Sequence, residues 1–343
     1  MDVGRPEAAV PDGMSNSHLK HFGPRAISFI TATFNLSIAH AQIPSIWKKS
    51  HILPVLKPNK PPNLSTSYRP ISLLCPLSKL LERLLLPFLT TALPTSPSQH
   101  GFKRRHSTIT ALLPLVTCVA RGFNQAKPPL RSAVVSTDIS KAFEVVDHNI
   151  LLRKLTAAPL HNNVLRWMSA FIRGRQSAVT YQGSKSKHRI VKSGVAQGSV
   201  SGPILFNTFV EDCPEEDADE EESFADDFDF LVADPKWDEI PNRLQPVIDS
   251  VVDWTNSLNL TVAPSKSFIT VFTPDTHESH KAPLITILYT PLPLARRPKL
   301  LGVTFDTHLT FTPHIDRTIA TVQQKTAPKS PSSPSGRPTS LPP

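Results

Sequence analysis

The sequence has little cysteine and lacks any cysteine pattern that builds a cross-link or a metal site. The only three cysteines, Cys75, Cys118 and Cys213, form neither a CxxC pair nor a Cys/His ligand spacing. This argues against a disulfide framework or a zinc site. It favours a reducing intracellular compartment, the nucleus or the cytoplasm.

Long apolar runs are also missing. Residues 1–11 contain no apolar signal core, and the leucine-rich run over residues 80–93 is broken by Glu82, Arg83 and Pro87. We therefore expect neither secretion nor a membrane span.

Glycine is scarce and proline is abundant, with 12 glycines against 35 prolines. Six of these prolines fall in residues 326–343, where almost no side chain is apolar. Such a segment cannot bury enough surface to fold, so we expect a disordered Pro/Ser-rich tail there and a disordered leader over residues 1–17.

Positive charge is in excess but unevenly placed. The chain has 37 Lys and Arg against 28 Asp and Glu, a formal net charge of +9. Twelve of the acidic residues lie between Glu211 and Asp229, a stretch without Lys or Arg. The basic background suits a polyanionic partner, and the acidic stretch suits a metal ion.

Two adjacent carboxylates, Asp226 and Asp227, lie between the short apolar runs of residues 223–232. Because strand side chains alternate faces, both can address one site only from a tight turn between two strands. Carboxylates about 4 Å apart repel by roughly 4 kcal/mol at an effective dielectric constant near 20, so holding them together usually needs a cation, with Mg²⁺ the natural candidate. For this pair alone, a solvated turn without a site is the alternative interpretation.

Periodicity predicts the remaining elements. We expect strands over residues 51–56, 131–137, 267–272, 285–289 and 300–305, and a hairpin of 176–182 with 188–192 about Gly183. Helices are expected over residues 27–41, 79–88, 109–119, 148–155, 164–172, 204–210, 244–258 and 314–322, the first of them mostly buried. Ser107 or Thr108 can cap the helix that starts at residue 109.

Eight short motifs then follow one another in a recognisable order. They are Trp47-Lys48 with Lys57-Pro58; Tyr68-Arg69-Pro70-Ile71-Ser72-Leu73-Leu74; Gln99-His100-Gly101-Phe102; Asp138 with Lys141-Ala142-Phe143; Gly194-Val195 with Gln197-Gly198-Ser199; Phe224-Ala225-Asp226-Asp227; Lys266; and Lys299-Leu300-Leu301-Gly302-Val303 with Asp306. From about Leu19 to about Thr318, the chain thereby resembles the reverse transcriptase domain of non-LTR retrotransposons, the LINE type and especially its jockey-like branch.

This resemblance implies an α+β fold of the right-hand polymerase type, with fingers, a palm with a ferredoxin-like core, and a truncated thumb. The implied boundaries are fingers over residues 18–131, a palm with interleaved fingers elements over 132–306, and a vestigial thumb start over 307–325. The leader 1–17 and the tail 326–343 flank these domains.

The resemblance also assigns roles to single residues. Asp138, Asp226 and Asp227 match the catalytic metal ligands, which hold two Mg²⁺ ions, with Mn²⁺ as an alternative. Lys266 matches the lysine that protonates pyrophosphate, for which an ordinary surface lysine is the alternative. Leu301 and Gly302 match the turn that supports the primer end.

A second group of residues matches the nucleotide site of the family. Lys57 and Arg69 correspond to the positions that meet the triphosphate, for which arginine suits bidentate contact. Gln197 and Gly198 correspond to the loop against nucleotide and template. Phe143 corresponds to the gate that leaves no room for a ribose 2′-hydroxyl, with a core phenylalanine as the alternative.

The function implied is that of an RNA-directed DNA polymerase. Its partners would be an RNA template, a DNA primer and deoxynucleoside triphosphates, and it would add nucleotides to the primer 3′-hydroxyl by two-metal phosphoryl transfer. Glu144, Ala196, Ser201 and Gly202 depart from the family pattern. The alternative is therefore a degenerate, non-catalytic remnant that at most binds nucleic acid; the oligomeric state stays open.

Overall fold

The computed structural model describes residues 10–214 and 218–326. Most of the expected leader and tail, residues 1–9 and 327–343, lie outside these ranges. Helix α1 (Asn16–Lys20) begins within the expected leader, where Ser15 caps it. Helix α10 (Thr312–Thr326) spans most of the expected thumb start and ends at the first residue of the expected tail.

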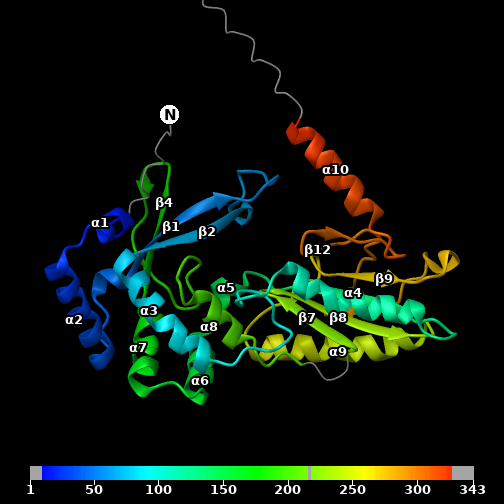
Figure 1. The fold of residues 1–343 in the computed structure, drawn as a ribbon, viewed down its shortest axis with the longest axis horizontal. Helices are drawn as coiled ribbons and strands as arrows, with labels where there is room; N and C mark the ends of the chain where they lie inside the picture. Colours follow the sequence, from blue (N-terminus) through cyan, green and yellow to red (C-terminus); the bar gives the residue numbers. More distant parts are fainter. Residues whose placement is uncertain (1–9, 215–217, 327–343) are drawn as a thin grey trace, which may run out of the picture.

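The first lobe is built on a five-stranded sheet (Figure 1). Strands β1 (Lys49–Leu56) and β2 (Tyr68–Leu74) form an antiparallel pair, and β4 (Gln176–Tyr181) joins β1 in parallel. Short strands β5 (Ser184–Lys185) and β6 (Arg189–Ile190) complete the expected hairpin about Gly183. The helices of this lobe are α2 (Pro24–His40), α3 (Pro76–Ala92), α6 (His148–Ala157) and α7 (Asn162–Ile172), with 3₁₀ turns at Ser45–Lys48 and Ser65–Ser67.

The second lobe holds a four-stranded antiparallel sheet in the order β7-β8-β3-β9. Its strands are β3 (Arg131–Asp138), β7 (Glu220–Phe224), β8 (Asp227–Asp234) and β9 (Phe268–Phe272). Helices precede β7 and β9 in the chain, so the order along the sequence is βαββαβ. This is the ferredoxin-like palm core that the motifs implied.

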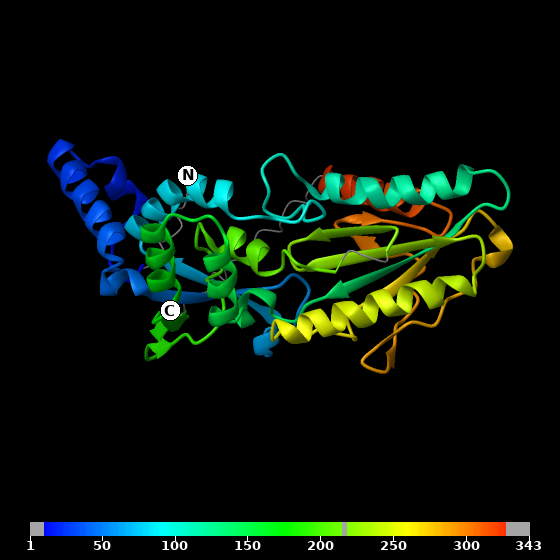
Figure 2. The ribbon, with the colours of Figure 1, turned by 90° about the horizontal axis from the view of Figure 1, so that it is seen from below.

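Both faces of this sheet are covered by a helix (Figure 2). Alternate strand residues point to opposite faces, so Val135 and Phe230 join the cluster around α9 (Glu239–Ser257), whereas Val134 and Leu231 join the cluster around α4 (Thr108–Asn124). Ser107 caps α4, one of the two residues expected to do so. The sheet is therefore a rigid layer between two helices.

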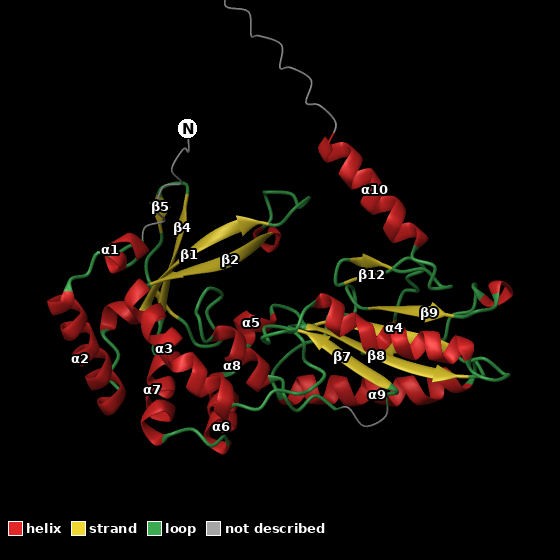
Figure 3. Cartoon of the chain, viewed as in Figure 1, coloured by secondary structure: helices red, strands yellow, loops and turns green. Residues whose placement is uncertain are grey.

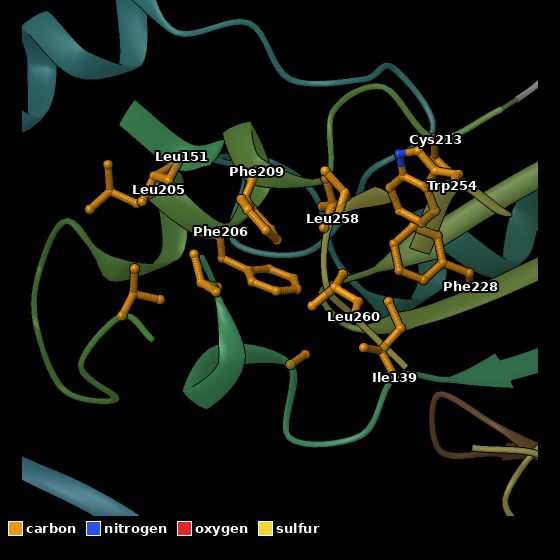
Figure 4. Packing of buried hydrophobic residues seen from close by; sticks show 14 of the residues in the cluster. Ile139, Leu151, Leu205, Phe206, Phe209, Cys213, Phe228, Trp254, Leu258 and Leu260 are labelled. Atoms are coloured by element: carbon orange, nitrogen blue, oxygen red, sulfur yellow. The ribbon is translucent and has the colours of Figure 1, made fainter. Parts of the chain in front are cut away.

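A continuous apolar core joins the two lobes (Figure 4). Helix α8 (Gly202–Phe209) buries Phe206 and Phe209 beside the short helix α5 (Ala142–Val145) and the end of the sheet. Phe228 on β8 meets Trp254 on α9 edge to face, with ring centroids 5.7 Å apart. Phe228, which follows the acidic turn at the start of β8, thus packs into the core that the two lobes share.

Three local expectations were wrong. Helix α2 is largely exposed, with Phe29 75% accessible and only Phe34 and Ser37 buried. The expected strands at 285–289 and 300–305 are each a hairpin of two-residue strands, namely β10 (Thr286–Ile287) with β11 (Thr290–Pro291) and β12 (Lys299–Leu300) with β13 (Val303–Thr304). Left-handed φ angles in the connecting residues, +45° at Leu301 and +96° at Gly302, turn the chain back.

The C-terminal helix α10 projects from the palm sheet and buries none of its side chains (Figure 3). A 3₁₀ turn, Thr276–Glu278, follows β9. None of the helices in residues 10–214 and 218–326 combines the length and the apolar character that crossing a membrane requires.

Trp167 should be one of the largest single contributors to stability, because it is fully buried, stacks on Phe171 and donates a 3.0 Å hydrogen bond to Ser37 Oγ on α2. Trp167→Ala should lower the free energy of unfolding in urea by about 3–5 kcal/mol. Phe29→Ala, on the exposed side of α2, should change it by less than about 0.5 kcal/mol. Equal losses in the two variants would contradict this account of the packing.

Candidate active site

Three carboxylates meet at one end of the palm sheet. Asp138 is the last residue of β3 and lies directly opposite Asp227, the first residue of β8. Asp226 precedes it in the two-residue loop that joins β7 to β8. The sequence prediction of a hairpin with acid at its tip is confirmed.

Burial and the neighbouring charges raise the pKa of two of these carboxyl groups, Asp226 and Asp227. Burial raises the pKa of Asp226, and the charge of Asp138 raises it further, against the attraction of Lys266 and Arg69. Desolvation in the cavity, together with Asp226 and Asp138, raises the pKa of Asp227 to about 6. The negative charges therefore stand close enough to disfavour one another, the situation that a bound cation relieves.

Lys266 neutralises one of these groups directly. Its Nζ lies 2.6 Å from Asp138 Oδ1. The lysine is held there because Ala263 N donates to Asp138 O at 2.8 Å, which ties the segment before β9 to the end of β3. The sequence placed Lys266 and Asp138 in one site, and the structure brings them together.

The donor chemistry of this end of the sheet suits a hard divalent cation, since carboxylate oxygens are the ligands that Mg²⁺ prefers. With the side chains as they stand, however, residues 10–214 and 218–326 contain no group of three or more His, Cys, Asp or Glu side chains that could hold a metal ion. Asp138 faces an ammonium group instead. A metal site made of Asp138, Asp226 and Asp227 therefore stays a prediction.

The carboxylates open into a cavity of about 590 Å³ between the two lobes. All the residues predicted for catalysis and for the nucleotide line it: Lys57, Arg69, Asp138, Phe143, Gln197, Gly198, Asp226, Asp227 and Lys266. Lys57 and Arg69 come from the β1–β2 hairpin, across the cavity from the acids. We call the side formed by this hairpin the cationic wall and the side formed by the three aspartates the acidic wall, which also carries Lys266.

Three aromatic rings form a row along this cavity. Phe143 lines it and stacks on the buried Phe206 with ring centroids 4.4 Å apart, while Phe102 meets Phe143 edge to face at 5.7 Å. Phe143 is half-buried, so its ring is both packed against the core and presented to the cavity.

The loop that carries Gln197 and Gly198 rests on strand β2. Ser72 N donates to Gln197 O at 2.7 Å. Gly198 has a φ of +121°, and a Cβ there would lie 2.5 Å from Ser72 O. Only glycine allows this approach, so the loop is fixed at the cavity edge.

A second cavity of about 220 Å³ lies on the other side of Asp138, Asp227 and Lys266. Leu301, one of the two residues expected to support a primer end, lines it; Gly302 is the next residue in the same turn but is not among the lining residues. The floor includes Asp229, which is almost completely buried and accepts a 2.5 Å hydrogen bond from Ser136 Oγ.

Sequence reasoning missed several residues of this site. Phe102 lines the first cavity and Asp229 the second, although neither is predicted to have a role from the motifs. Gln99 belongs to one of the motifs without an expected role, yet its side chain contacts Ala225 in the acidic turn. No local pattern indicates that contact, because the two residues are 126 positions apart.

The model of the reverse transcriptase (RNA-dependent DNA polymerase) family matches residues 55–305. The chain belongs to the reverse transcriptase family. This confirms the family inferred from the motifs, and the matched range contains every predicted site residue of this reverse transcriptase domain.

Curated relatives agree with this assignment. The domain is 32% identical over 329 residues to the probable RNA-directed DNA polymerase from transposon BS of Drosophila melanogaster, covering 92% of this chain and 35% of that protein. It is 29% identical over 316 residues to the RNA-directed DNA polymerase from mobile element jockey of Drosophila funebris, covering 89% of this chain and 34% of the relative. The chain spans about a third of the length of these relatives.

Solved structures support the right-hand fold. Apo telomerase from Candida tropicalis, truncated from its C-terminal domain, aligns with a TM-score of 0.50 and 11% identity over 83% of this chain and 59% of that one. Telomerase from Candida tropicalis in complex with the TWJ fragment of telomeric RNA aligns with a TM-score of 0.51 and 12% identity over 82% of this chain and 48% of that one.

Asp229 should make the stability of this reverse transcriptase domain depend on pH. Burial raises the pKa of Asp229 to about 7, and the charge of Asp227 adds to the rise. Between pH ~4, near the ordinary pKa of Asp, and pH ~7, the folded chain keeps a proton that the unfolded chain has lost, so stability falls as the pH rises. Asp229→Asn should remove this loss, on the order of 2–4 kcal/mol by pH 8.

The measurement is the free energy of unfolding at pH 5.5 and pH 8. Asp253→Asn, on the exposed face of α9, is the control and should keep the wild-type pH dependence. If Asp229→Asn kept the wild-type slope as well, the buried carboxyl would not be the source of it.

Proposed function

We propose that this chain is the RNA-directed DNA polymerase domain of a non-LTR retrotransposon. The observation that carries the proposal is the single cavity in which Asp138, Asp226 and Asp227 face Lys57 and Arg69. A nucleoside triphosphate needs this combination, with cations for its phosphates and carboxylates at the reacting end. The named activities of the Drosophila relatives agree with this assignment.

The cationic wall would bind the triphosphate. Arg69 offers a planar donor group for bidentate contact with phosphate, and Lys57 adds a point charge. Lys57 is positioned by two bonds to the 3₁₀ turn before β2: its N–H donates to Ser67 O at 2.8 Å and its Nζ donates to Thr66 O at 3.0 Å. The second bond would be exchanged for a phosphate oxygen.

The acidic wall would hold the reacting end. Asp138 and Asp226, with Asp227 beside them, are the residues that would bind two Mg²⁺ ions. Such ions lower the pKa of an attacking hydroxyl and stabilise charge on the leaving group. Lys266 would leave Asp138 and, as an ammonium ion lining the same cavity, give its proton to the departing pyrophosphate.

The deoxyribose would lie against Phe143. Because Phe206 stacks behind it and Phe102 meets it at the side, the ring of Phe143 has little freedom to withdraw from a 2′-hydroxyl. The primer end would enter from the second cavity, where Leu301 and Gly302 form the turn of the β12–β13 hairpin.

The template and primer are proposed from charge and from the relatives. Outside residues 211–229 the sequence carries 37 basic and 16 acidic residues, a surface suited to an RNA/DNA hybrid. Three free cysteines fit the reducing interior of a cell, so we place the domain in the nucleus or the cytoplasm.

Asp138→Asn and Asp226→Asn should each lower Mg²⁺-dependent primer extension on an RNA template by at least about 100-fold, because too little negative charge then remains to hold the ions. Single-nucleotide addition is measured with and without Mg²⁺. Asp253→Asn should keep wild-type activity. Extension that survives both substitutions would reject the proposed centre.

Phe143→Ala should admit ribonucleotides, because the volume of the ring does the excluding. The preference for deoxynucleotides, taken as the ratio of kcat/KM values for the two sugars, should fall by roughly tenfold or more. Phe143→Tyr keeps that volume and should keep the preference. An unchanged ratio in Phe143→Ala would mean that the ring serves packing alone.

A further inference from the structure

A single buried side chain from the first lobe grips the backbone of the acidic turn. Gln99 is 2% exposed, and its Oε1 accepts from Ala225 N at 2.8 Å while its Nε2 donates to Ala225 O at 3.1 Å. The same Oε1 also accepts from Gly101 N at 2.7 Å. One amide group therefore satisfies both backbone groups of the residue that precedes Asp226.

Ala225 needs such a hold because of its conformation. Its φ is +64°, in the left-handed region that costs a residue with a Cβ free energy relative to its ordinary conformations. A residue stays there only where the surroundings impose it. The two hydrogen bonds from Gln99 fix the peptide planes on either side of Ala225, and these planes set the direction in which Asp226 leaves the turn.

The backbone around Gln99 prevents this side chain from shifting. His100 N donates to Ser223 O at 2.7 Å and Ser223 N donates to Ser98 O at 3.0 Å, so the segment runs as a parallel partner beside β7. At Gly101 an added Cβ would lie 2.3 Å from Ala225 N, and the buried Asn207 donates to Gly101 O at 2.9 Å. The segment that carries Gln99 is therefore held against the acidic turn by its pairing with β7 and by the close approach of Gly101 to Ala225.

We propose that Gln99 is a positioning residue that holds Ala225 in its left-handed conformation and thereby directs Asp226 and Asp227 into the cavity. This inference rests on the proposed polymerase function for its kinetic consequence, but not for its structural one. Gln99 acts through the backbone and touches no reacting group. Its loss misdirects the carboxylates without removing any of them.

The test compares two matched glutamines. Gln245 makes the same pair of bonds far from the cavity: Thr286 N donates to its Oε1 at 2.8 Å and its Nε2 donates to Thr286 O at 3.0 Å. Gln99→Met and Gln245→Met both keep most of the side-chain volume, and both leave the N–H and the C=O of one residue without this partner. Gln99→Met also removes the acceptor of Gly101 N, and Gln245→Met also removes a 2.8 Å bond to Asp249. The cost of losing the paired backbone bonds is common to the two variants.

Gln99→Met should lower kcat for nucleotide addition by roughly 10- to 100-fold, because small misplacements of reacting groups cost that much. KM for the deoxynucleotide should change by less than about threefold, since Lys57 and Arg69 are untouched. Gln245→Met should keep the wild-type kcat. Hydrogen exchange at the Ala225 amide should speed up by roughly tenfold in Gln99→Met alone.

A double variant separates positioning from folding. Glycine adopts the left-handed region without strain, so adding Ala225→Gly to Gln99→Met should recover part of the lost kcat. Equal kcat and equal Ala225 exchange in Gln99→Met and Gln245→Met would overturn the inference, as would a loss in Gln99→Met that Ala225→Gly does not relieve while the variant stays folded. If wild type itself extends no primer, the proposed function fails, and Ala225 exchange alone then decides whether Gln99 holds the turn.

Discussion

Repulsion between acids at one end of the palm sheet is the constraint on which the site depends. Asp138 and Asp227 are paired across neighbouring strands, and like charges in that position destabilise a sheet. Asp226 and Asp227, which are adjacent in the chain, add to this repulsion. The fold tolerates this because the strands behind the acids are buried on both faces, between α4 and α9, and have no freedom to splay apart.

The positive groups around the acids come from separate parts of the chain. Lys266 approaches Asp138 from the segment before β9, and Arg69 on the β1–β2 hairpin opposes the rise that burial causes in the pKa of Asp226. Each of these cations lines the same cavity and is available to another anion. The proposed substrate, with several phosphates, would therefore enter without leaving the acids unbalanced, because it would bring cations of its own.

The sequence predicted the secondary structure around the site correctly where the pattern is local. Strand β3 ending at Asp138, the hairpin at Asp226 and Asp227 and the cap at Ser107 all depend on alternation or on residues a few positions apart. The prediction from the sequence failed where a single backbone angle decides whether a strand continues or turns back. Nothing in the apolar run 300–305 shows that Leu301 adopts a left-handed φ and reverses the chain. It also failed for α2, whose apolar side chains are exposed although their spacing suits a buried helix.

Polar contacts between distant segments could not be predicted at all, and they connect the second lobe to segments that precede it in the sequence. Buried Glu82 on α3 accepts from Val200 N, Ser201 N and Ser201 Oγ at 2.7 to 2.9 Å, and so fixes the start of α8 beside the loop that carries Gln197. Burial raises the pKa of Glu82, while these donors and Arg175 oppose the rise and favour the charged form. Gln99 fixes the acidic turn in the same manner.

Ser201 and Gly202 are positions where this chain departs from the family pattern. Ser201 nevertheless contributes two of the donors to Glu82, and a Cβ at Gly202 would lie 2.6 Å from Ser199 Oγ. The departures are therefore integrated into the packing of this loop. The start of α8 and the acidic turn are both held by polar side chains that precede Asp138 in the sequence, so the strands of the palm sheet alone do not contain the contacts that shape the candidate site.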